Sequence, residues 1–107
     1  MGNRVRRKLN YWMEVLGLDA YEGRISLINP MQVTDEDDNV GATLVGGIIE
    51  DNAACIITTR RLSEEDIVHE LLHFVRTDVG HEQIVEETKE LIIARNLNFA
   101  GGLARER

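Results

Sequence analysis

Two histidines four residues apart, with a glutamate directly after the first, constrain the fold of this chain more than any other feature. They form the stretch HELLH at residues 69–73. On an α-helix, residues i and i+4 lie on one face, so His69 and His73 can bind one metal ion together if this segment is helical. Glu70 then lies beside the metal, where it can act on a metal-bound water. We therefore expect a helix at this point, built around a metal site.

The residues before and after the motif predict a helix from Glu64 to about Asp78. Ser63 can cap its first N–H groups, and the stretch SEED at residues 63–66 resembles a capping box with Asp in place of Glu. Gly80 is expected to break the helix. The two histidines fall outside the apolar sector of this helix, which argues against histidines that serve only the core. The apolar sector comprises Ile67, Val68, Leu71, Leu72, Phe74 and Val75.

A zinc site needs a third protein ligand and keeps its fourth position open. The third histidine of the chain, His81, follows Gly80, and a glycine allows the sharp turn that would bring a second helix back along the first. We expect that helix over residues 81–96, with His81 on the face toward the motif. Glu82, or Glu86 or Glu87, stays open as an alternative third ligand, because the phase of this helix is uncertain by about one residue. Asp66 or Asp78 is a candidate to orient a ligand histidine.

The remaining segments predict one N-terminal helix and a small sheet. Residues 4–17 show helical spacing of apolar residues, with Trp12 as a core anchor. Arg24–Val33, Ala42–Glu50 and Ala53–Thr59 are expected strands, and a two-residue turn predicts that the last two pair antiparallel. Gly46-Gly47 indicates a bulge or a close backbone approach. The order of helix, strands, helix and helix predicts an α+β fold with an antiparallel or mixed sheet of about three strands.

Length and charge limit the organisation and the partners of the chain. The 107 residues predict a single domain over residues 1–97, followed by a flexible tail over residues 98–107. The net charge of −7 argues against nucleic acid as a partner. Cys55, the single cysteine, is expected to be a core thiol in a reducing compartment, and we expect a cytoplasmic protein. No apolar run is long enough to cross a bilayer, so no membrane partner is expected.

Between Ala42 and about Asn96, the chain resembles the zincin metallopeptidases. The resemblance rests on the strand pair, the Ser63-capped helix with HELLH, and the turn into a second helix. The small size is similar to the minimal zincin scaffolds called minigluzincins and to short zincin-like proteins of phage and prokaryotic genomes. The resemblance implies one zinc ion per chain, Glu70 as the catalytic base, and a rim strand at Ala53–Thr59 that holds a peptide substrate by β-addition.

Two departures from the zincin subfamilies leave the third ligand open. Gluzincins use a glutamate on the second helix, which His81 does not match unless Glu82 or Glu86 serves instead. Metzincins place the third histidine two residues earlier than His81.

The resulting expectation is a zinc-dependent metallopeptidase that acts on peptides or proteins. The alternative is a catalytically weak or inactive metal-binding or interaction module of the same fold. A further variant is a peptidase blocked by its own tail, Phe99–Arg107, lying over the cleft.

Overall fold

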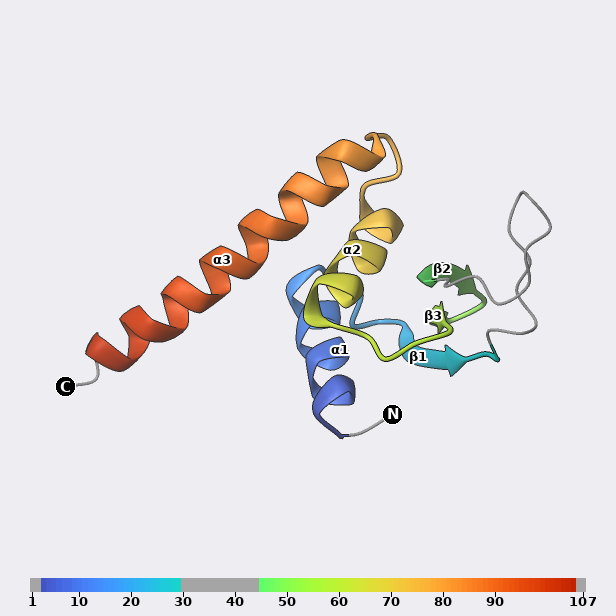
Figure 1. Cartoon of the computed structure of the whole chain (residues 1–107), viewed down its shortest axis with the longest axis horizontal. Helices are drawn as coiled ribbons and strands as arrows, with labels where there is room; N and C mark the ends of the chain where they lie inside the picture. The colour runs from blue at the N-terminus through green and yellow to red at the C-terminus, as the bar shows by residue number, and fades with distance from the viewer. Residues whose placement is uncertain (1–2, 30–44, 106–107) are drawn as a thin grey trace.

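The structure is a computed structural model that describes residues 3–29 and 45–105, with side chains described as far as residue 97. Within these residues the fold is α+β, with three helices and a mixed three-stranded sheet (Figure 1). The predicted class is therefore confirmed at this level. The elements are α1 (Asn3–Val15), β1 (Glu22–Leu27), β2 (Val45–Glu50), β3 (Ala53–Thr58), α2 (Glu64–Val75) and α3 (His81–Arg105).

The sheet has the strand order β1-β3-β2, so that β3 lies in the centre. Strands β2 and β3 form the predicted antiparallel hairpin around a turn at Asp51-Asn52, where Asp51 has a φ of 53°. Strand β1 pairs with β3 in parallel, with Ile25 opposite Ile56. The strand expected over Arg24–Val33 begins earlier, at Glu22, and ends at Leu27; residues 30–33 and 42–44 lie outside the described residues.

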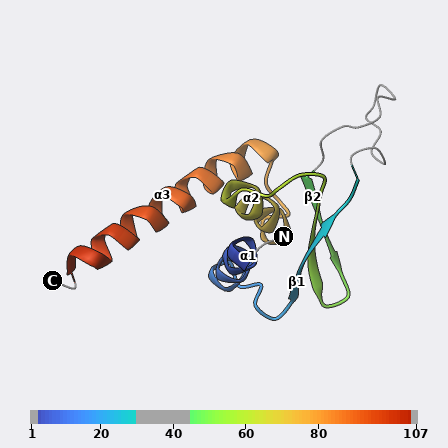
Figure 2. The same ribbon diagram turned by 60° about the horizontal axis from the view of Figure 1, so that its bottom comes forward.

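Helices α1 and α2 cover the same face of the sheet (Figure 2). Burial alternates along β3, with Ala54 and Ile56 fully buried and Cys55 and Ile57 only partly so. Trp12 is 1% exposed and anchors α1 in the core, as predicted, and its Nε1 donates to Glu64 Oε2 on α2 at 2.8 Å. Cys55 is a half-buried free thiol rather than a residue of the core, because its side chain lies on the face that the helices leave uncovered.

Helix α3 packs along α2 and then continues beyond it (Figure 1). The predicted end near Asn96 is wrong, because the helix includes Gly101-Gly102 and ends at Arg105. At 1.5 Å per residue, Arg105 lies about 36 Å along the helix from His81. Residues 99–105 therefore form the last turns of α3 and lead away from the helix start. Among the described residues, no helix combines the length and the apolar character needed to span a membrane.

Candidate metal centre

A complete capping box sets the start of α2, the helix that carries the HELLH stretch. Ser63 Oγ accepts from the backbone N–H of Asp66 at 3.2 Å, and Asp66 Oδ2 accepts from the N–H of Ser63 at 2.8 Å. Arg60 donates to both carboxylate oxygens of Asp66, at 2.6 and 2.8 Å. The hydrogen bonds found for the carboxylate of Asp66 thus go to the cap and to Arg60 rather than to a ligand histidine. Residues 69–73 follow one turn later, in regular helix.

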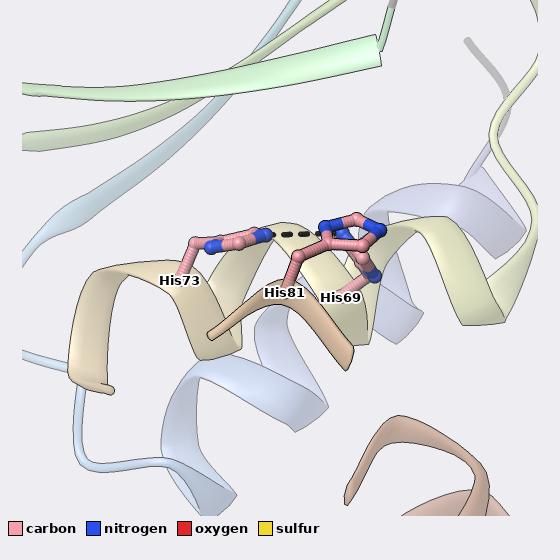
Figure 3. Close-up of side chains that lie close together, drawn as sticks. All are labelled: His69, His73 and His81. Carbon is pink, nitrogen blue, oxygen red and sulfur yellow. Dashed lines mark hydrogen bonds between the residues drawn. The ribbon is translucent and has the colours of Figure 1, made fainter. Parts of the chain in front are cut away.

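The two histidines of the motif lie side by side on α2. Their Nε2 atoms are 3.1 Å apart, and their ring centroids are 4.7 Å apart (Figure 3). Burial, followed by the neighbouring charges of His73 and His81, lowers the pKa of His69. A lowered pKa favours the neutral imidazole, which is the form that binds a metal.

Helix α3 brings the third histidine to this pair. His81 is its first residue, and the ring centroid of His81 lies 4.9 Å from that of His69 and 5.8 Å from that of His73 (Figure 3). The reversal does not depend on glycine at position 80, because the φ of Gly80 is not positive and an added Cβ atom would meet nothing within 4 Å. The carbonyl of Gly80 accepts from the N–H groups of residues 83 and 84 in the first turn of α3. Glu82 and Glu86 do not belong to the group of converging ligand atoms found among the described residues, whereas His81 does.

The three imidazoles lie close enough together to hold a metal ion. One ring nitrogen from each of His69, His73 and His81 lies within 4.8 Å of the other two. Tetrahedral zinc with Zn–N bonds of about 2.0–2.1 Å separates two ligand nitrogens by about 3.3 Å. The 3.1 Å separation of the two Nε2 atoms within the α2 pair is close to this value. Three imidazoles also leave one tetrahedral position open, as in catalytic rather than structural zinc sites.

Glu70 lies between these ligands and the sheet. Its side chain is 12% exposed, and its Oε2 is 4.0 Å from Nε2 of His69. Burial, together with the nearby charge of Asp66, raises the pKa of Glu70 to about 7. A carboxyl group with this pKa exchanges its proton readily near neutral pH, as a general base requires.

The edge strand β2 approaches the site closely at Gly47. A Cβ atom at this position would lie 2.6 Å from Cζ of Phe74 and 3.5 Å from Oε1 of Glu70. The close backbone approach predicted for Gly46-Gly47 is thus confirmed, at Gly47, and the ladder with β3 continues through it without a bulge. The close approach also explains the burial of Glu70, which no helical periodicity could reveal.

The prediction that Ala53–Thr59 forms the substrate-holding rim is wrong. These residues form β3, and both edges of β3 are already paired, with β1 and with β2. A strand without a free edge cannot accept a further strand. The strand that borders the site with a free edge, among the described residues, is β2.

A cavity of about 280 Å³ adjoins His69 between α2 and α3. Sequence reasoning did not identify it, because its walls come from two helices whose packing is set by tertiary contacts. Thr88, one of its lining residues, is 4% exposed and donates through Oγ1 to the carbonyl of Ile84 at 2.7 Å. The lining comprises Glu65, Asp66, His69, Glu70, Val85, Thr88 and Lys89.

Comparisons of the chain with protein-family models, with curated proteins and with solved structures find no match.

Proposed function

We propose that this chain is a zinc-dependent metallopeptidase of the zincin type. The observation that carries the proposal is the convergence of His69, His73 and His81 from two helices, with the carboxylate of Glu70 beside them. Each of these residues has the chemical type that such a site requires: three neutral nitrogen ligands and one general base. We assign one zinc ion to each chain.

Zinc held by the three histidines would act as a Lewis acid on a water molecule and on the carbonyl of the scissile peptide bond. The contribution of the chain's own side chains is to accept and to donate protons at defined positions. Glu70 takes a proton on its carboxylate from the attacking water and then passes it to the leaving amine. The carboxyl group of Glu70 would hold the proton between the two steps.

The substrate in this proposal is an extended peptide that pairs with the edge strand β2. Backbone pairing at a free sheet edge supplies affinity without requiring a particular sequence. The position of Gly47, directly over Glu70, supports this placement, because a peptide bound along β2 would pass close to the carboxylate. Ile48 and Ile49 on the same strand are 46% and 39% exposed and offer apolar contacts to the peptide.

The proposal is tested by incubating the zinc-loaded protein with a mixed peptide library and following cleavage by mass spectrometry. We expect cleavage by the wild type and a loss of about a hundredfold or more in the Glu70→Gln variant, because general base catalysis contributes on that order. The Glu70→Gln variant should still bind one zinc ion. Glu86→Gln removes one carboxylate of the same type from α3 and should leave the rate unchanged. A zinc-loaded wild type that cleaves nothing, or an equally active Glu70→Gln variant, would contradict the proposal.

The second candidate function is a metal-binding interaction module that does not turn over substrate. The exposure of His81 supports it, since an open site has few walls to hold a peptide. In that case chelation would lower the melting temperature markedly, because zinc binding contributes to folding. Glu70→Gln would then change neither the stability of the zinc-loaded chain nor its binding to a partner.

A further inference from the structure

The third ligand of the candidate centre owes its position to the helix that carries it. His81 is the first residue of α3 and is exposed. Its ring lies beside the rings of the other two histidines, and no side-chain hydrogen bond of His81 is found among the described residues. The placement of its imidazole therefore depends on how α3 is docked and rotated against α2.

The apolar part of the α2–α3 contact sets the distance between the helices. Ile84 is fully buried and Thr88 is 4% exposed, and both lie near His81 in angle around α3. Non-directional apolar packing of this kind resists separation of the helices more than it resists a small rotation of one about its axis. A directional contact is needed to define that rotation.

Arg76 and Glu87 supply the directional contact. Arg76 caps the C-terminus of α2, where its N–H donates to the carbonyl of Leu72 at 2.7 Å. Its Nε donates to both carboxylate oxygens of Glu87 on α3, each at 3.1 Å. At 100° per residue, Glu87 lies about 120° around α3 from His81, on the flank of the interface. The contact thus opposes rotation of α3 in the direction that would move His81.

A small rotation would be enough to break the metal geometry. The tip of a side chain lies roughly 6 Å from the axis of its helix, so a rotation of about 20° displaces it by about 2 Å. Metal–ligand distances vary by only about 0.2 Å in well-formed sites. The rotation of α3 must therefore be defined closely for His81 to bind.

We propose that Arg76 and Glu87 are a positioning pair for His81, a role that rests on the proposed metal centre. The pair does not touch the metal. It fixes the rotation of α3 about its own axis, so that the imidazole of His81 lies beside the imidazoles of His69 and His73. Removal of either member should weaken metal binding while the chain remains folded, because an ion pair that is partly exposed, here with side-chain exposures of 45% and 25%, contributes little to stability.

The test compares Arg76→Met, Glu87→Gln and the double variant with the wild type and with Glu86→Gln. Glu86→Gln makes the same chemical change one residue earlier. Among the described residues, the Glu86 side chain forms no hydrogen bond or ion pair with α2, and it lies outside the ligand group. Zinc affinity is measured by competition with a chromophoric chelator, and ligand geometry by the visible absorption of bound Co²⁺. We expect about fivefold weaker zinc binding in each single variant and no further loss in the double variant. The Co²⁺ spectrum should change in these three and stay unchanged in Glu86→Gln.

Three results would overturn the proposal. The first is wild-type zinc affinity and an unchanged Co²⁺ spectrum in Glu87→Gln. The second is an equal loss of affinity in Glu86→Gln, which would reflect charge alone. The third is a lowered melting temperature of the metal-free variants with an unchanged Co²⁺ spectrum, which would reflect stability alone. A wild type that binds zinc but cleaves no peptide would contradict the peptidase proposal alone. The positioning role would still be decided by the zinc affinities and the Co²⁺ spectra of the variants.

Discussion

Gly47 on the edge strand β2 covers the carboxylate of Glu70 on α2: a Cβ atom at position 47 would lie 3.5 Å from Oε1 of Glu70. The same atom would lie 2.6 Å from the ring of Phe74, which is closer than side chains normally approach. The absence of a side chain at this position lets the free edge of the sheet lie directly over the candidate catalytic group.

Gly47→Ala should destabilise the chain, because the added methyl group forces the Phe74 ring to move. We expect a loss of about 1–2 kcal/mol in the free energy of unfolding, measured by urea denaturation. Gly46→Ala is the matched control, since nothing lies within 4 Å of its added Cβ. Phe74→Leu removes the ring atoms that clash, so Gly47→Ala should cost less in that background. Equal losses from both glycine substitutions would contradict the close approach.

The stability of the metal-free chain should depend on pH through Glu70. Burial raises its pKa in the folded chain to about 7, from an ordinary value of 4.5. The folded chain therefore holds a proton that the unfolded chain releases, so the contribution of Glu70 is fully present below pH 4.5 and is lost as the pH rises through 7. At pH 8, Glu70→Gln should be more stable than the wild type by up to about 3 kcal/mol.

Unfolding titrations of both proteins in the presence of chelator, from pH 4 to pH 8, check this dependence. The lowered pKa of His69 has the opposite effect on the pH dependence of stability near pH 6, and this histidine is present in both proteins. A difference between the two proteins that stays constant across the whole range would show that Glu70 is not buried as described.

The capping box should contribute measurably to stability. Ser63→Ala removes the acceptor for the N–H of Asp66 and should cost about 1 kcal/mol in thermal or urea unfolding. Ser26→Ala on β1 removes an exposed hydroxyl and is expected to change stability by less than about 0.5 kcal/mol. If the two variants unfold alike, the cap does not define the start of α2.

Deletion of residues 98–107 should leave zinc affinity and peptide cleavage unchanged. The reason is geometric: α3 runs away from His81, so its end does not reach the histidines of its own chain. Zinc titration and the peptide assay on the shortened chain check this expectation. An increase in cleavage after the deletion would instead support the self-blocked peptidase that the sequence suggested.

Local signals in the sequence predicted much of the site. Ser63 and Asp66 define a helix start through contacts with residues next to them in the chain. The hairpin of β2 and β3 depends on a two-residue turn, which is equally local. These features were correctly predicted for that reason.

Non-local contacts explain what the sequence could not predict. The rim strand was assigned wrongly because β1 pairs with the far edge of β3, and no pattern within β3 reveals which of its edges is covered. The burial of Glu70 depends on β2 passing over it, far from it in sequence. The end of α3 was placed too early because Gly101-Gly102 lowers helix propensity, yet the helix continues through both glycines.

Zinc titration of the metal-free wild type beside His81→Ala, Glu82→Ala and Glu86→Ala tests the three-histidine centre most directly. We predict one zinc ion per chain for the wild type, for Glu82→Ala and for Glu86→Ala, with equal affinities. His81→Ala should bind at least about a hundredfold more weakly, because it loses one of three protein ligands. An unchanged affinity in His81→Ala, together with a loss in Glu82→Ala or Glu86→Ala, or no zinc binding by the wild type, would contradict the account.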